Sequence, residues 1–273
     1  MLRRLAIPLT VVWISLMSGI VSSKVRAEEL SSTSINYAYA AWIGSGYYRV
    51  DGRNLYVLRV PFGLTLVEQD RKKWGIDLLL PVTIGLDEFT EEEEKIASVS
   101  IIPGVELEYE VLPQWWLKPY GQMGVGQDLS QHDETLIWGY GILSLAQFPY
   151  KRMTFELGNS VRYANNEYSG TGGDKGFSMW EIGLNAKLPV SWNIQQRPND
   201  INLFFVYSEF MNDLELISVV DEDVDISRLF KIGIALNAES NFSILGIKFR
   251  GGGLTFTYGD GFTGIGITTG FPF

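Results

Sequence analysis

The segment WGIDLLLPVTIGLD, residues 74–87, alternates between apolar and polar or small residues with a period of two. One set of alternate residues, from Trp74 to Leu86, is entirely apolar, whereas the other set includes Asp77 and Asp87. Side chains of a strand point alternately to its two faces, so this pattern predicts a strand with one apolar and one polar face. The segment is also much longer than the strands of about five or six residues that are typical of soluble proteins.

The same alternation recurs along most of the chain. It is clear in 98–111, 153–164 and 178–190, and less regular in 54–67, 229–237 and 243–258, whereas 36–48, 135–148 and 201–211 are strand-like without a decisive period. A change of phase across Gly251, Gly252 and Gly253 predicts a bulge or bend. After the N-terminal region, no apolar run reaches the roughly 18 residues that a spanning helix needs. We therefore predict an all-β fold, a transmembrane antiparallel up-and-down β-barrel of about 12 strands.

The first 27 residues have the features of a secretory signal peptide. Arg3 and Arg4 precede an uncharged, mostly apolar run, and Ala27 fits a small-residue cleavage site. An uncleaved membrane anchor is the alternative. We predict a signal peptide at 1–27 and an outer-membrane barrel at 28–273, located in the bacterial outer membrane.

The connections between the predicted strands alternate in length and charge. One set is long and acidic or polar (87–96, 128–134, 165–176 and 212–226), and the other is mostly shorter and more basic (69–73, 112–114, 149–152, 239–241 and the longer 191–200). Long loops at one end and short turns at the other are typical of outer-membrane barrels. An aromatic girdle is expected beside the second set, formed by Trp74, Trp115, Trp116, Phe148, Tyr150 and Trp192. An even number of strands places both termini in the periplasm.

The last segment, residues 261–273, ends in phenylalanine. Its alternation puts Ile265, Ile267, Phe271 and Phe273 on one face. Such a strand resembles the signal that outer-membrane barrels present to the barrel-assembly machinery, which would make that machinery a partner, alongside outer-membrane lipid.

With these residues in view, the chain resembles bacterial outer-membrane β-barrels, and among them a solitary autotransporter-type β-domain. The resemblance covers residues 34–273 and includes the Gly-rich closing pair of strands at 246–273. It departs from autotransporters because only residues 28–33 precede the first strand, so no secreted passenger is expected.

The polar faces of the strands predict a charged lumen. A narrow lumen should pair opposite charges, because an unpaired buried charge is costly. The network is expected either to plug a small barrel or to line a narrow pore that selects solutes. Its predicted members are Arg59, Asp77, Glu106, Glu108, Glu110, Lys118, Glu156, Arg162, Glu181, Lys187, Lys231, Lys248 and Arg250.

Composition limits the alternatives. The formal net charge of −10 disfavours a nucleic-acid partner, and the absence of cysteine excludes disulfides and thiolate chemistry. The single histidine, His132, leaves open an outer-membrane hydrolase of the lipase or protease type, with Ser130 or Asp133 beside it. The acidic runs 91–94 and 221–225 are interpreted as solvated loops. We predict a monomeric, non-enzymatic pore or membrane scaffold without cofactor or metal, with a soluble periplasmic all-β protein as a further alternative.

Overall fold

A computed structural model describes residues 34–35, 39, 42–50, 53–69, 74–88, 95–129, 134–168, 174–194, 197–219, 222–244 and 247–273. The chain divides into two units, Met1–Ser32 and Thr33–Phe273, and the described residues all belong to the second. The predicted signal peptide and the residue His132 therefore lie outside the described residues. The described part contains no helix long and apolar enough to cross a membrane.

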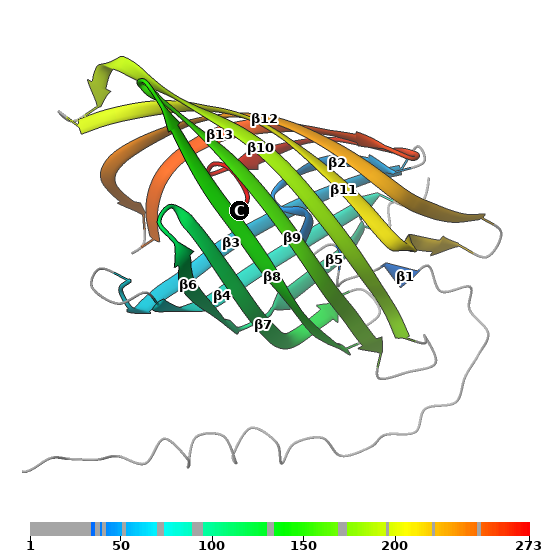
Figure 1. Ribbon diagram of the computed structural model, residues 1–273. Coiled ribbons are helices and arrows are strands. Elements are labelled where there is room, and N and C mark those ends of the chain that lie inside the picture. Colours follow the sequence, from blue (N-terminus) through cyan, green and yellow to red (C-terminus); the bar gives the residue numbers. More distant parts are fainter. Residues whose placement is uncertain are drawn as a thin grey trace, which may run out of the picture. The chain divides into compact units, whose positions relative to one another are not determined.

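The described residues form a closed antiparallel barrel (Figure 1). Its strands are β1 (Ser34–Ile35), β2 (Gly46–Val50), β3 (Arg53–Val67), β4 (Trp74–Glu88), β5 (Lys95–Ile101), β6 (Gly104–Leu112), β7 (Trp115–Asp128), β8 (Glu134–Tyr150), β9 (Met153–Tyr168), β10 (Asp174–Ile194), β11 (Arg197–Val219), β12 (Glu222–Ile244), β13 (Ile247–Gly259) and β14 (Phe262–Thr268). From β2 to β14, neighbours in sequence are neighbours in the sheet except at β5 and β6, and pairing of β14 with β2 closes the ring.

Two elements share one position in the ring. Both β5 and β6 pair with β4 on one side and β7 on the other, and the break between them falls at Ile102 and Pro103. Proline cannot donate a backbone hydrogen bond to the ladder, which explains an interruption here. Counted this way, 12 strands close the barrel, as the sequence predicted.

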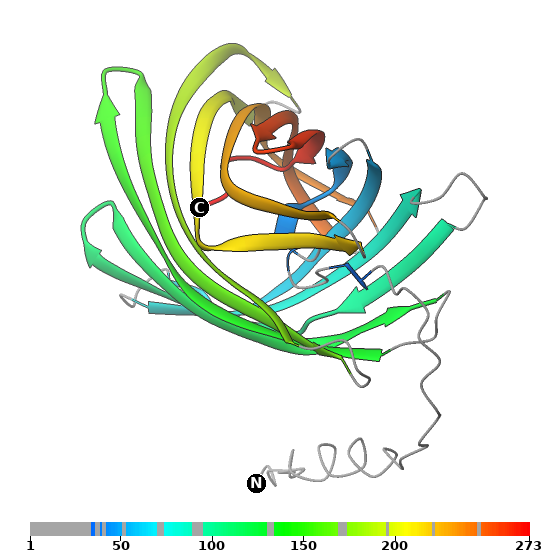
Figure 2. The same ribbon diagram turned by 90° about the vertical axis from the view of Figure 1, so that its right-hand side faces the viewer.

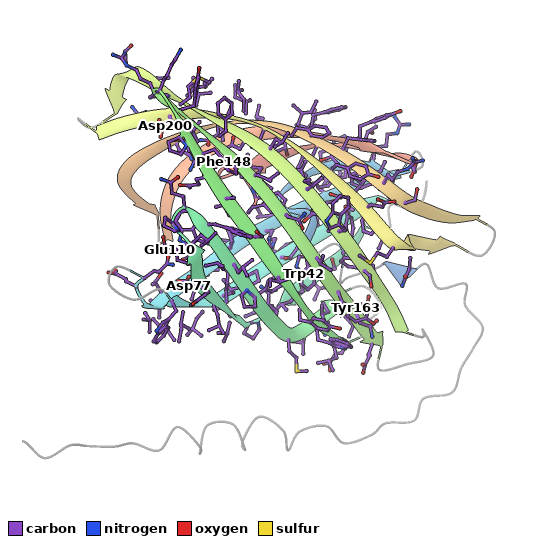
Figure 3. The ribbon with its side chains drawn as sticks, in the orientation of Figure 1. Trp42, Asp77, Glu110, Phe148, Tyr163 and Asp200 are labelled. Carbon is purple, nitrogen blue, oxygen red and sulfur yellow. The ribbon has the colours of Figure 1, made fainter. Side chains whose placement is uncertain are left out.

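The alternation of the strands is confirmed by their burial. On β4, Leu78, Leu80, Ile84 and Leu86 are exposed on the outer surface, whereas Thr83 on the opposite parity is buried. The same outward apolar face follows the other strands around the ring, and Figure 3 shows side chains projecting from its outside. Because these exposed side chains are apolar, the outer surface suits lipid rather than water.

The connections alternate between two barrel ends, as predicted, but their lengths separate the ends only in part. Strands are joined at one end, called here the loop end, by residues 51–52, 89–94, 130–133, 169–173, 220–221 and 260–261, and at the other, called the turn end, by 68–73, 113–114, 151–152, 195–196 and 245–246. Gln114 and Lys151 have positive φ angles of 69° and 55°, the left-handed conformation that tight hairpin turns require. Both belong to the short set of connections.

Two predicted loops are wrong. Residues 212–226 lie mostly within β11 and β12, which continue as a two-stranded ribbon to Val219 and Glu222. The directly paired side chains Leu214 and Ile226 are buried, and their contact explains why an acidic segment stays in strand conformation. Residues 239–241 likewise belong to β12, and the chain reverses at 245–246 instead.

The predicted irregularity near Gly251 of β13 is present, but the extra residues lie on β12, the strand that pairs with it. Gly251 pairs with Asn237 and Phe249 with Phe242, so the register shift occurs between Asn237 and Phe242 of β12.

Aromatic side chains form contacts on the outer surface in the loop-end half of the barrel. Ring pairs join neighbouring strands, with centroids 5.0 to 6.2 Å apart: Trp138–Tyr163, Tyr140–Tyr163, Trp180–Tyr207, Tyr207–Phe230 and Tyr47–Tyr56. The predicted girdle at the turn end is also exposed at Trp74, Trp115, Phe148 and Tyr150, while the side chain of Trp192 is outside the described set. Figure 3 shows Phe148 and Tyr163 toward opposite ends. Two aromatic levels are typical of barrels that cross a membrane.

The ends of the described chain do not lie at the same end of the barrel. β1 pairs with β11 at Ile217 and Ser218, beside the loop end, whereas β14 runs from the 260–261 turn at the loop end toward the turn end. The prediction of two termini on one side is therefore wrong for the described residues. The reason is that Tyr39 and residues 42–45 lie inside the barrel before β2 begins, which adds a passage that the strand count does not include.

Candidate functional site

The last five residues turn into the barrel (Figure 2). β14 ends at Thr268, whose hydroxyl accepts a hydrogen bond from the Gly270 N–H at 3.1 Å and donates one to the Gly270 carbonyl at 2.6 Å. Gly270 has a φ of 153°, which L-residues rarely adopt. These local bonds end the strand and direct Phe271 and Phe273 away from the outer surface.

Phe271 and Phe273 pack on glycines of the inner wall. A Cβ atom on Gly158 of β9 would lie 2.3 Å from the Phe273 ring, and one on Gly183 of β10 would lie 2.6 Å from it. The Phe271 ring also contacts Phe204 of β11, with centroids 5.8 Å apart. The prediction that both phenylalanines share the outer face of Ile265 and Ile267 is therefore wrong, although Ile265 and Ile267 are exposed there.

The residues before β2 occupy another level of the lumen. Tyr39 is buried, and its ring meets Phe177 and Phe210 edge to face, with centroids 5.7 and 5.6 Å apart. Trp42 also packs on Phe177, and a Cβ atom on Gly139 would lie 2.9 Å from the Trp42 ring. Since Phe177 and Phe210 lie toward the loop end of β10 and β11, this cluster fills the half of the lumen opposite the C-terminal aromatics.

Glu156 is the centre of one inner network. Its carboxylate is buried and lies 2.6 Å from the Lys187 ammonium. It also accepts hydrogen bonds of 2.7 Å from the side-chain amides of Gln147 and Asn185, and Asn185 in turn donates to Asn202 at 2.8 Å. The network crosses β8, β9, β10 and β11, and so ties four strands together from inside.

Glu181 is the centre of a second network. It pairs with Arg162, and it accepts hydrogen bonds of 3.0 Å from the hydroxyls of Ser160 and Ser208. The Arg162 and Glu181 side chains are only 13% and 11% exposed. Both carboxylate oxygens are therefore engaged, and the buried charge is compensated.

The remaining predicted lumen residues divide into three groups. Lys118 lies 3.5 Å from Glu108, and Asp77 and Glu106 lie close enough to interact with this pair electrostatically. Glu110 is half-buried on the same face of β6, while Arg59 and Lys231 form no ion pair within the described residues. The side chains of Lys248 and Arg250 are not among those described.

The structure thus brings together four residues of the predicted network in two separate clusters, and it adds partners that the sequence did not identify. Ser160, Ser208, Asn185 and Gln147 share the inner parity of their strands, so alternation alone could have indicated them. Tyr39 and Trp42 gave no such signal, because residues 36–48 have no decisive period.

Catalytic and metal sites are not supported by the described residues. They contain no group of three or more His, Asp or Glu side chains placed to hold a metal ion. His132, its neighbours Ser130 and Asp133, and the side chains of the acidic runs 91–94 and 221–225 lie outside the described set.

Comparison with known proteins bears on the fold. No family model and no curated protein matches the sequence. Among solved structures, the β domain of the Bordetella autotransporter BrkA matches with a TM-score of 0.59 and 12% sequence identity, covering 83% of this chain and 96% of that one. At this identity the likeness concerns the fold alone. With the closed ring of 12 strands, it shows that the chain has an autotransporter-type β-barrel fold.

Proposed function

We propose that the protein is a non-catalytic, monomeric barrel of the bacterial outer membrane whose lumen is normally closed. The observation that carries this proposal is the occupation of the lumen at two levels. Tyr39 and Trp42 fill the loop-end half, and Phe271 and Phe273 pack against the wall toward the turn end. The Glu181–Arg162 network lies between these two levels, and the Glu156–Lys187 network lies on the turn-end side of the phenylalanines.

The outer surface supports the membrane location. Its exposed apolar side chains and two aromatic levels match the lipid-facing surface of outer-membrane barrels. A soluble barrel would expose this surface to water, at a cost of about 25 cal/mol per Å² of apolar area. Membranes should accordingly release the protein only with detergent, and release by plain buffer would argue for the soluble alternative.

Closure can be tested by conductance of the purified protein in planar bilayers. The wild type should show little steady conductance, because aromatic side chains and ion-paired groups obstruct the path. Replacing Tyr39 and Trp42 by alanine, or Phe271 and Phe273 by alanine, should each raise it partly, and the fourfold variant should conduct most.

A matched control uses the outer face of the last strand. Replacing Ile265 and Ile267 by alanine also removes two apolar side chains near the C-terminus but leaves the lumen untouched, so conductance should stay at the wild-type level. A large steady conductance of the wild type, or a fourfold variant that conducts no more than this control, would contradict closure.

The C-terminal strand also supports recognition by the barrel-assembly machinery, which we propose as a partner. In the folded barrel, Ile265 and Ile267 are exposed, whereas Phe271 and Phe273 are turned inward. We propose that the two phenylalanines contribute to recognition before the barrel closes. In that case, alanine at Phe271 and Phe273 should slow assembly in cells, whereas alanine at either Tyr39 or Trp42 should not.

A further inference from the structure

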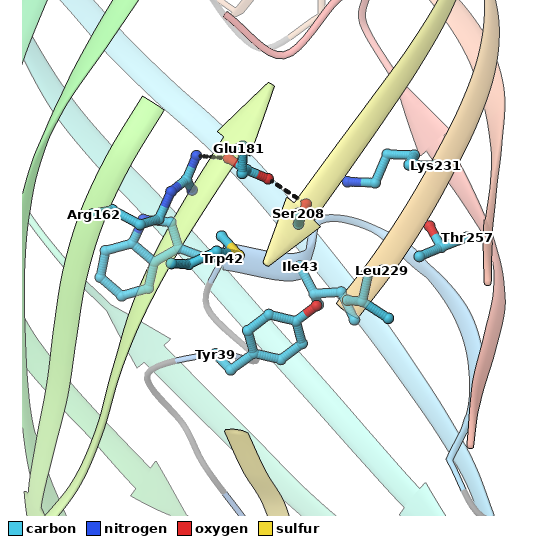
Figure 4. Close-up of a pocket in the computed structure, with 10 residues that line it drawn as sticks. Tyr39, Trp42, Ile43, Arg162, Glu181, Ser208, Leu229, Lys231 and Thr257 are labelled. Carbon is cyan, nitrogen blue, oxygen red and sulfur yellow. Dashed lines mark hydrogen bonds and ion pairs between the residues drawn. The ribbon is translucent and has the colours of Figure 1, made fainter. Parts of the chain in front are cut away.

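A pocket inside the barrel is bordered by cationic side chains. It lies between Tyr39 and Trp42 on one side and the inner wall on the other, where Arg162, Lys231 and Thr257 line it (Figure 4). The free space it encloses is small, about 30 Å³, and it is partly open to the rest of the lumen.

Positive charge exceeds negative charge around this pocket. Arg59, Arg162 and Lys231 lie near enough to repel one another electrostatically. Within the described part of the chain, Glu181 is the one carboxylate that acts on Lys231. Arg162 and Lys231 therefore share one carboxylate, and Arg59 adds a third positive charge nearby, in a partly dehydrated space where electrostatic interactions are stronger than in water.

Glu181 cannot satisfy all three. Its two oxygens already accept from Arg162, Ser160 and Ser208. Lys231 points toward the pocket in Figure 4, yet it makes neither an ion pair nor a hydrogen bond with the described residues. The guanidinium Nε atoms of Arg59 and Arg162 are also buried without a hydrogen-bond partner there. Buried donors of this kind are costly unless a partner is supplied.

We propose that the pocket binds a small inorganic anion, held by Lys231 and Arg162 with the Thr257 hydroxyl as an additional donor. The anion offsets the excess positive charge and accepts the hydrogen bonds that Glu181 leaves unmade. The anion site does not depend on the proposed closure of the lumen. It requires only the charged side chains and the pocket, which are present whether or not the lumen is blocked.

The test is thermal unfolding of the detergent-solubilised full chain in a series of salt solutions of constant ionic strength. Chloride replaces gluconate stepwise along this series. Gluconate is too large for the narrow space around Lys231 but screens surface charges equally. The unfolding midpoint of the wild type should rise saturably with chloride, by about 5–10 °C at one hundred times the dissociation constant. Lys231→Met should abolish the rise and, in gluconate, should unfold at a higher temperature than the wild type.

Lys187→Met is the matched control, since it removes a lumen cation that is already paired with Glu156. It should lower the midpoint in both salts and keep the chloride response. Crystals soaked in bromide supply a second measurement, with an anomalous peak expected between Lys231 and Arg162. A chloride response that is equal in the wild type and Lys231→Met, or a pocket without bromide, would overturn the proposal.

Discussion

At the scale of single residues, Glu156 shows what the inner charges do for stability. Its carboxylate is buried, whereas its partner Lys187 is 30% exposed. Glu156→Leu should lower the free energy of unfolding by about 2–3 kcal/mol, less than the roughly 3–5 kcal/mol for breaking a fully buried pair, because water partly solvates Lys187. Urea titration of the protein in lipid vesicles measures the loss. The double variant with Lys187→Met should recover only part of it, because the amides of Gln147 and Asn185 still lack their acceptor, and a double variant as unstable as the single one would show that these hydrogen bonds and packing, not the charge of Lys187, are responsible.

Asp260 gives a pH dependence at the loop end. The Ser227 hydroxyl donates to its carboxylate at 2.6 Å, and the N–H groups of Ser227 and Arg228 donate at 3.2 and 3.1 Å. These bonds favour the ionised form and hold the pKa of Asp260 below its ordinary value. The stabilisation is therefore complete above the pKa of the unfolded chain, about 3.9, and is lost as the pH falls through the lower folded value.

Hydrogen exchange of the β13–β14 hairpin measures this effect. Between pH 5 and pH 3, the opening free energy of the wild-type hairpin should fall, after correction for the intrinsic exchange rate. In Asp260→Asn, the opening free energy of the hairpin should already be lower at pH 5, and it should change little down to pH 3. If both proteins show the same pH dependence, another carboxyl group must be the cause.

At the scale of the element, the ribbon of β11 and β12 is anchored by two residues of the buried apolar cluster inside the barrel. Leu214 and Ile226 are paired across it and buried, at 1% and 0% exposure. Leu214→Asp should bury an unpaired charge and open the ribbon, so that limited proteolysis cleaves within 212–226. Met211→Asp is the control, because Met211 is 61% exposed and its change should leave cleavage unaltered.

The elements also show what alternation can and cannot predict. The period of two predicts the strands themselves. It also predicts that Asp77, Glu156 and Glu181 point inward, because a strand has only two faces. The inward turn of Phe271 depends instead on the φ angle of Gly270 and on glycines in β9 and β10, which are far away in sequence. Likewise, the acidic ribbon stays folded through a pairing between Leu214 and Ile226 that no single segment reveals.

At the scale of the whole molecule, the residues inside the barrel set its topology. Ser34 lies beside the loop end, whereas the chain after β14 lies toward the turn end, so labels at these positions should be reached from opposite sides of the membrane.

The chain has no cysteine, and each introduced cysteine is therefore the only target for a thiol reagent. In intact cells, an impermeant maleimide should label Ser34→Cys and Ser169→Cys but not Arg152→Cys, which lies in a turn at the other end. All three should react after the membrane is permeabilised, which controls for folding and reagent access. Labelling of Ser34→Cys only together with Arg152→Cys would mean that the chain enters the barrel from the turn end, and the passage through Tyr39 and Trp42 would then have to run the other way.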